Sequence, residues 1–166
     1  MDEAVLQLDP VLRKCWMKKG KQHRVPLPEK SRQSQRIFAG YNWRKDTVAW
    51  HLPERHDSQG FVTWLEHLML EYYPTQFVVL VMDNASIHHS LMSRAALTLF
   101  EYRLLAVYLP AYTPNLNPIE RYWRHLKDRV CANKLYNNLN ALRDAVVKEL
   151  TLQNDLDYEL RFQTCK

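Results

Sequence analysis

The stretch 109–130 constrains the fold of this chain more than any other. It reads LPAYTPNLNPIERYWRHLKDRV, in which the end of an apolar segment is followed by a Pro- and Asn-rich turn and then by a helical pattern. Asn117 is a typical helix N-cap and Pro118 suits the first helical position, which places Glu120 in the first turn. Apolar residues follow at the spacing of one buried stripe: Ile119, Tyr122, Trp123, Leu126 and Val130. The sequence therefore predicts a helix that packs on a core and carries an acid at its amino end.

The polar face of this predicted helix carries one acid and two bases. Glu120, Arg124 and Lys127 recur at helical spacing beside the apolar stripe. A carboxylate next to two cations can hold a metal ion beside phosphate oxygens, as a nucleic-acid active site requires. The alternative is structural, since Glu120 would also complete a capping box and pair with Arg124.

Two further acids stand on predicted strands. Residues 2–8 alternate as a strand that carries Asp2, and the apolar run 76–82, expected to be a strand buried on both faces, delivers Asp83 at its carboxyl end. If Asp2, Asp83 and Glu120 converge, they can hold two divalent ions about 4 Å apart. An all-oxygen ligand set favours Mg²⁺ or Mn²⁺. Alternatively, Asp83 caps a turn and Asp2 belongs to a frayed terminus.

Other polar residues lie next to these acids. Asn84 directly follows Asp83, and His88 and His89 come soon after, so that one histidine could approach a phosphate or the attacking water. The alternative is that these histidines only satisfy local hydrogen bonds. Glu3 is excluded from the site, because strand side chains alternate and Glu3 should point away from Asp2.

The order of the predicted elements indicates an α/β fold in a single domain of 166 residues. Strands are predicted at 2–8, 35–43, 47–52, 76–82 and 104–109, and helices at 58–73 with Ser58 as cap, at 90–102, from 118 onward and at 138–153. The last dozen residues are weakly helical in pattern. This order suits a mixed sheet with a parallel part, flanked by helices.

Positive charge is concentrated in one segment. Between Arg13 and Arg36 there are nine Lys or Arg residues and one acid, whereas the remaining segments hold fourteen bases and seventeen acids. Residues 11–34 show no sustained periodicity and are expected to form a long loop. Such a basic loop attracts a phosphate backbone through counterion release. The alternative is a merely solvated loop.

Several classes of protein are excluded by composition. The glycines, at 20, 40 and 60, cannot form a G-x-G-x-x-G or P-loop motif, and no G-x-S-x-G is present. The three cysteines, at 15, 131 and 165, lack the spacing of a zinc site or a disulfide framework. The longest apolar run, 77–82, is too short to span a bilayer, and the acidic start is unlike a secretory signal. A cytoplasmic protein is expected.

Three motifs together resemble the catalytic domain of IS630-type transposases, in the IS630/Tc1/mariner superfamily. They are DE at 2–3, DNASIHHS at 83–90 and LPAYTPNLNPIERYWRHLK at 109–127. The resemblance implies an RNase H-like fold with a mixed five-stranded sheet and a DDE triad of Asp2, Asp83 and Glu120. The 36 residues between Asp83 and Glu120 are similar to the family's spacing. It also implies two Mg²⁺ ions, replaceable by Mn²⁺, cleavage of transposon ends, and joining of a freed 3′-hydroxyl to target DNA.

The resemblance further implies the partners of the chain. DNA would be contacted by residues from all three motifs and from the basic loop: Asn84, His88, Lys18, Lys19, Lys21, Arg124 and Lys127. The loop looks like the one with which such enzymes reach a partner subunit, so a homodimer is expected in the active complex, at the nucleoid of a bacterial cytoplasm. No membrane and no small-molecule cofactor is expected.

One departure from the family concerns the start of the chain. Family members carry helix-turn-helix DNA-binding modules upstream, which this sequence lacks, and the first strand looks clipped. We therefore expect the catalytic portion of a longer or interrupted element. Two other interpretations are an inactive or adopted remnant that binds DNA nonspecifically, and an RNase H-like nuclease acting on RNA or hybrids. The Pro-Asn-Pro motif argues against the nuclease.

Overall fold

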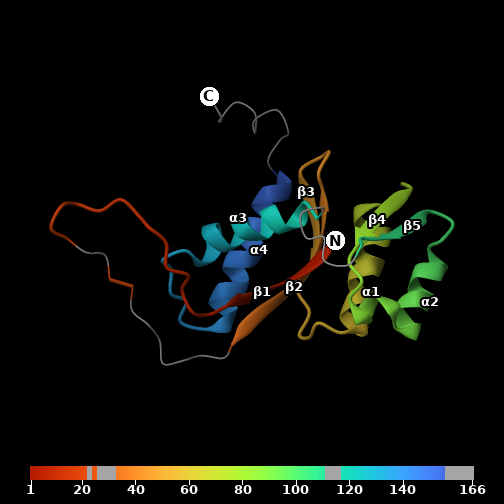
Figure 1. The fold of residues 1–166 in the computed structure, drawn as a ribbon, viewed down its shortest axis with the longest axis horizontal. Helices are drawn as coiled ribbons and strands as arrows, with labels where there is room; N and C mark the ends of the chain where they lie inside the picture. Colours follow the sequence, from red (N-terminus) through yellow and green to blue (C-terminus); the bar gives the residue numbers. More distant parts are fainter. Residues whose placement is uncertain (22–23, 26–32, 111–116, 156–166) are drawn as a thin grey trace.

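Figure 1 shows the computed structural model, which describes residues 1–21, 24–25, 33–110 and 117–155. The elements in chain order are β1 (Asp2–Gln7), β2 (Ser34–Asn42), β3 (Thr47–His51), α1 (Ser58–His67), the π-helix η1 (Leu68–Tyr72), β4 (Val78–Met82), the 3₁₀ helix η2 (Ser86–His89), α2 (Leu91–Leu99), β5 (Leu104–Tyr108), α3 (Ile119–Cys131) and α4 (Leu139–Asp155). The predicted α/β order is confirmed, whereas the prediction for the last dozen residues lies mostly outside the described ranges. Within those ranges, none of the helices has the length and apolar character needed to cross a membrane.

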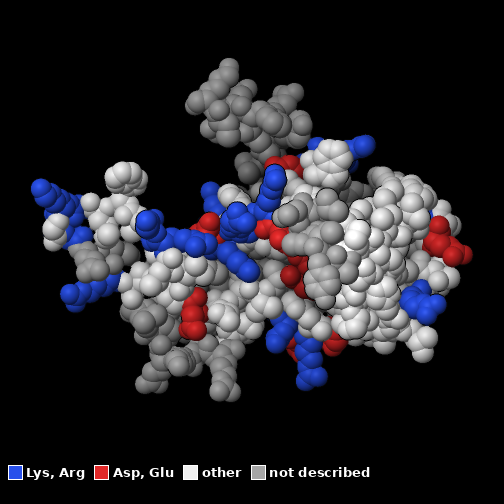
Figure 2. All heavy atoms as spheres, viewed as in Figure 1, with Lys and Arg blue, Asp and Glu red and all other residues white. Residues whose placement is uncertain are grey.

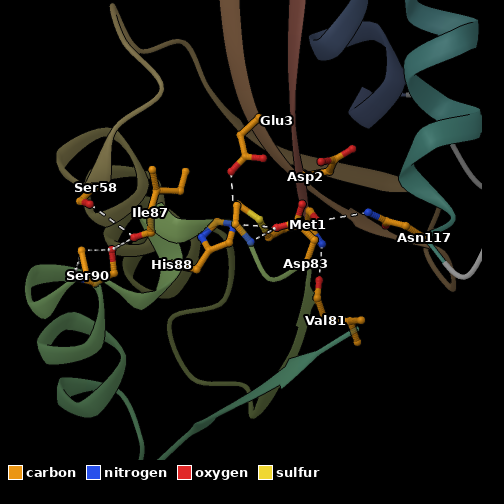
Figure 3. A network of polar contacts seen from close by, with 12 residues as sticks. Met1, Asp2, Glu3, Ser58, Val81, Asp83, Ile87, His88, Ser90 and Asn117 are labelled. Carbon is orange, nitrogen blue, oxygen red and sulfur yellow. Dashed lines mark hydrogen bonds and ion pairs between the residues drawn. The ribbon is translucent and has the colours of Figure 1, made fainter. Parts of the chain in front are cut away.

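The strands form two small sheets. Strands β1, β2 and β3 are antiparallel neighbours, and β4 pairs in parallel with β5. Among the described residues, the two sheets meet at the start of β1, where the Met1 ammonium donates to the carbonyl of Val81 (Figure 3). Beyond that bond, a groove of about 540 Å³ lies between the end of β2, at Gly40–Asn42, and β4. The expected five-stranded sheet is therefore replaced by a three-stranded and a two-stranded sheet.

Two apolar cores cover opposite faces of the three-stranded sheet (Figure 1). Helices α3 and α4 pack on one face through the predicted stripe, whose members are all buried: Ile119, Tyr122, Trp123, Leu126 and Val130. On the other face, Phe38 and Ala49 pack against α1, η1, α2 and the β4–β5 pair. Strand β1 thus runs between two different environments.

The helix starts differ from the predictions in their caps. Asp57, not Ser58, caps α1, because its Oδ1 accepts the amide of Gly60 at 2.9 Å. Helix α3 has Pro118 as its cap, without a side-chain bond. The side chain of Asn117 instead donates to the carbonyl of Met1 at 3.4 Å. The entrance of α3, and with it Glu120, is consequently tied to the start of β1.

Strand β4 is not buried on both faces as expected. Leu80 and Met82 are buried, but Val79 is 56% exposed, and Leu105 of β5 is 51% exposed. The apolar run therefore has one packed face and one exposed face. The physical reason is that the described helices α1 and α2 pack on the same face of this small sheet.

The described part of the basic loop projects from the body (Figure 1). Its base is fixed, since Val11 pairs with the backbone around Ala132 and the guanidinium of Arg13 lies 2.7 Å from Asp128. Residues 12–21 are exposed and have neither helix nor strand. This confirms a loop for these residues, and 22–23 and 26–32 lie outside the described ranges.

Candidate metal and nucleic-acid site

Asp2 and Glu120 face one solvent-accessible hollow. Asp2 is at the start of β1, and its Oδ2 accepts a hydrogen bond from Nε1 of Trp123 at 3.0 Å. A hollow of about 480 Å³ is lined by Asp2 and Glu120 together with Arg124, Lys127 and Arg13. Glu120 forms no ion pair with Arg124 in the described structure, so the purely structural interpretation of Glu120 gains no support. Glu3 also contributes to the lining, so this hollow combines three acids and three bases.

The protonation of Asp2 is shifted by its position. Burial raises the pKa of Asp2 to about 6, and the charges of Glu3 and Asp83 act in the same direction. The hydrogen bonds from the Glu3 backbone and from Trp123 oppose this rise. Asp2 is therefore only partly ionised just below neutral pH, and a cation bound there would displace a proton.

Asp83 follows β4, as predicted, and turns toward the other face of β1. Its Oδ1 accepts the amide of Ala85 at 2.9 Å and lies 3.3 Å from Nε2 of His88. Glu3 approaches the same nitrogen, with Oε1 at 3.2 Å (Figure 3). Figure 3 also shows Asp2 directed away from this cluster, toward α3. We call Glu3, Asp83 and His88 the histidine cluster.

The histidine cluster corrects two sequence-based expectations. Alternation along β1 sends Asp2 and Glu3 to opposite faces as expected, but Asp83 lies on the Glu3 side and not, as expected, with Asp2. The side chain of His88 is fully buried, and its ring packs edge-to-face against Phe61 with the ring centroids 4.7 Å apart. Without a rearrangement, His88 does not reach a phosphate at the surface.

The expected triad is only partly brought together. Asp2 and Glu120 share the hollow, and the charge of Asp83 contributes to the raised pKa of Asp2. Among the described residues, however, the acids and histidines with ligand atoms within 4.8 Å of one another are Glu3, Asp83 and His88. Asp83 is therefore adjacent to the hollow, but its carboxylate belongs to a different cluster.

The residues expected to contact DNA fall into three groups. Arg124 and Lys127 line the hollow, and Lys18, Lys19 and Lys21 are exposed on the basic loop. Figure 2 shows Lys and Arg side chains on the projecting loop and across the middle of this face, next to acidic side chains. Asn84 instead has a bond within the fold, since Nδ2 donates to the carbonyl of Leu109 at 2.6 Å.

The structure adds residues that the sequence did not single out for the site. Trp123 was predicted as core, yet its indole N–H orients Asp2. Arg13 was counted only as part of the basic segment, yet it lines the hollow. Because Trp123 adjoins Arg124 and follows Glu120 by one helical turn, its N–H could have been proposed for this face. His88 was named as a candidate DNA contact, but its meeting with Glu3 had no signal in the sequence, since it depends on tertiary packing.

Comparison with known sequences agrees with the motifs. The sequence profile of a family described as DDE superfamily endonuclease matches residues 1–143. A 39 kDa protein of insertion element IS630 from Shigella sonnei is 27% identical over 134 residues, which are 80% of this chain and 38% of that protein. The chain thus spans less than half the length of this relative.

Solved structures share the fold. The Mos1 transposase in a paired-end complex with the left transposon end matches 94% of this chain and 47% of its own, with a TM-score of 0.67 and 16% identity. The catalytic core of BIV integrase matches 69% of this chain and 74% of its own, with a TM-score of 0.50 and 16% identity. Other Mos1 paired-end complexes contain Mn or Mg. The fold is therefore of the RNase H-like type found in transposase and integrase catalytic domains.

Proposed function

The chain belongs to the DDE superfamily endonucleases, and we propose that it is the catalytic domain of a DNA transposase related to IS630 and mariner elements. It would cleave transposon ends and join the freed 3′-hydroxyl to target DNA in the bacterial cytoplasm. The observation that carries the proposal is the hollow in which Asp2 and Glu120 lie beside Arg124 and Lys127, with Asp83 near enough for its charge to act on Asp2. We take residues 1–166 as one catalytic domain.

In this proposal, Asp2, Asp83 and Glu120 hold two Mg²⁺ ions, with Mn²⁺ as a substitute. The carboxylate oxygens fit such ions, and the proton on Asp2 is weakly enough held to be lost near neutral pH. The ions supply activation of the attacking oxygen and stabilisation of the leaving oxygen. Trp123 keeps Oδ2 of Asp2 directed toward α3. Repulsion between Asp2 and Asp83 is offset once a cation binds, which favours their approach.

The bases have a separate role in binding DNA. Arg124 and Lys127 neutralise the phosphate that enters the hollow, and Lys18, Lys19 and Lys21 grip the duplex backbone farther away. We propose that the active complex is a homodimer in which the projecting loop reaches the second subunit. The support is its exposure, including a fully exposed indole at Trp16.

A second candidate function is a noncatalytic DNA-binding module. The observation in its favour is that Asp83 lies with Glu3 and His88 and not with Asp2 and Glu120. Such a module would bind DNA through the basic loop with a steep salt dependence but without a requirement for divalent ions.

Plasmid nicking separates the two candidates. The full chain is incubated with supercoiled plasmid and Mg²⁺ or Mn²⁺, alongside Asp83→Asn and Glu120→Gln, with the exposed Glu101→Gln as matched control. A transposase domain nicks DNA only with metal, and only the first two variants lose nicking while keeping DNA binding. Metal-independent binding without nicking would support the module. Cleavage confined to RNA or RNA–DNA hybrids would contradict both.

A further inference from the structure

The histidine cluster brings together three potential ligands from three parts of the chain. Glu3 comes from β1, Asp83 from the turn after β4 and His88 from η2 (Figure 3). His88 is fully buried and Glu3 is 15% exposed, whereas Asp83 remains 48% exposed. The cluster is thus buried at His88 and Glu3 and accessible to solvent at Asp83.

Hydrogen bonding does not account for this arrangement. Nε2 of His88 lies 3.2 Å from Glu3 and 3.3 Å from Asp83, yet neither Nε2 nor Oε1 of Glu3 has a hydrogen-bond partner of acceptable geometry. The single N–H at Nε2 of His88 can point at only one of the two carboxylates. The oxygen of the other carboxylate then faces Nε2 with no proton between the two atoms. A buried polar atom without a hydrogen-bond partner destabilises the fold.

The spacing instead matches ligands around a cation. At a bond length of about 2.1 Å, ligand atoms at octahedral or tetrahedral angles are roughly 3.0–3.4 Å apart. The two distances to Nε2 fall in this interval. The charges agree as well, because Glu3 and Asp83 contribute two negative charges, which a divalent cation balances and a single imidazolium does not.

We propose that Glu3, Asp83 and His88 form a transition-metal site that takes Mn²⁺ through one imidazole nitrogen and two carboxylate oxygens. An imidazole ligand suits Mn²⁺ or a later transition metal better than Mg²⁺, which prefers oxygen. The site differs from the proposed Asp2, Asp83 and Glu120 set, although the two share Asp83. Its metal joins β1 to the end of β4 and thereby fixes the Asp83 carboxylate beside the strand that carries Asp2.

Pulsed EPR on the Mn²⁺-loaded full chain tests this assignment without reference to activity. A metal-bound imidazole gives nitrogen modulation of the Mn²⁺ signal, and loss of the free-ion signal gives the affinity. The wild-type protein and Glu120→Gln should both show the modulation. His88→Gln should abolish it, and Glu3→Gln should weaken binding by at least the roughly 10- to 100-fold typical of losing a supporting ligand contact.

Folding is monitored by circular dichroism, because His88 is buried. If His88→Gln does not fold, the comparison of Glu3→Gln with Glu120→Gln decides, since Glu3 is partly accessible. Bound Mn²⁺ without nitrogen modulation, no Mn²⁺ binding at all, or equal affinity of wild type and Glu3→Gln would overturn the proposal. Failure of the proposed function looks different: plasmid nicking would be absent while the nitrogen modulation persists.

Discussion

The two sides of β1 carry neighbouring acids in contrasting surroundings. Asp2 faces a solvent-accessible hollow with Arg124, Lys127 and an indole N–H. The carboxylate of Glu3, one residue later, faces the histidine cluster. We call this the closed side, because His88 is fully buried and Glu3 nearly so, and the Asp2 side the open side. Alternation along one strand separates two carboxylates of the same charge, and the elements packed on each face then decide their chemistry. The open side suits a hydrated ion with a phosphate, and the closed side suits an ion held by the protein.

Asp83 gives the largest expected effect, because it is common to both sides. Asp83→Asn should abolish metal-dependent nicking, by more than about 1,000-fold, since several kcal/mol of transition-state stabilisation depend on its ion. It should also remove the nitrogen modulation of bound Mn²⁺. Nicking gels and pulsed EPR measure the two losses.

The single-sided variants are the controls for Asp83→Asn. Glu120→Gln should lose nicking but retain the nitrogen modulation of bound Mn²⁺. Glu3→Gln should bind Mn²⁺ more weakly at the histidine cluster. If Asp83→Asn abolished only one of the two signals, the shared position of Asp83 would be wrong.

The basic loop gives the next largest effect, confined to the open side. Replacing Lys18, Lys19 and Lys21 together by Gln should weaken DNA binding uniformly across sequences and reduce the salt slope by about 2–3, close to 0.9 per lost phosphate contact. Fluorescence anisotropy at several salt concentrations measures the slope. The charge-matched control replaces Lys45, Arg94 and Lys148, which are exposed elsewhere. If the two triple variants had equal salt slopes, the basic loop would not be part of the DNA-binding surface.

Local features of the fold followed from the sequence, because they depend on short-range chemistry. The stripe from Ile119 to Val130 is buried as its helical spacing predicted, and β2 and β3 form the predicted hairpin. Asp83 follows a strand, and Glu120 lies in the first turn of a helix, as expected. Each of these predictions rests on periodicity within about ten residues of one segment.

The errors arise where distant segments compete. Asn117 would cap α3 in isolation, but its amide bonds the carbonyl of Met1, which is 116 residues away. Asp83 was expected beside Asp2 but lies beside Glu3, because the alternation rule says nothing about which face of β1 receives Asp83. His88 is polar in sequence and buried in the fold, since η2 turns it between Phe61 and two carboxylates. Tertiary packing decided all three.

Asp2 gives a smaller, pH-dependent effect on the open side. Its folded pKa of about 6 exceeds the ordinary value of 3.8, so its contribution to stability is present below about pH 4 and is lost as the pH rises through 6. At about 1.4 kcal/mol per pKa unit, and discounted for partial exposure, the loss is about 1–2 kcal/mol. The measurement is urea unfolding with a chelator present. Between pH 4 and 7, the free energy of unfolding should decline less in Asp2→Asn than in the wild type.

Another group titrates nearby, so the difference between the two proteins is the informative quantity. Burial lowers the pKa of the Met1 amino group to about 6, which makes stability rise between pH 6 and 8 in both proteins. Glu3→Gln serves as the comparison from the closed side: it removes one of the charges that raise the pKa of Asp2 but leaves Asp2 in place, so the decline should become smaller and persist. An unchanged pH profile in Asp2→Asn would show that Asp2 titrates normally.

Trp123 gives the smallest effect and the sharpest distinction between the two sides. Trp123→Phe keeps an aromatic ring in the core but removes the donor to Oδ2 of Asp2. The lost hydrogen bond to an ionised carboxylate should cost about 1.5 kcal/mol at pH 8 and less at pH 4, where Asp2 is protonated. The packing change is common to both pH values, so the difference between them isolates the bond. The Mn²⁺ signal of the histidine cluster should not change, because among the described residues Trp123 packs in the core on the Asp2 side of β1. A loss of nitrogen modulation in this variant would show that the two sides of β1 are coupled through the strand and do not act as separate sites.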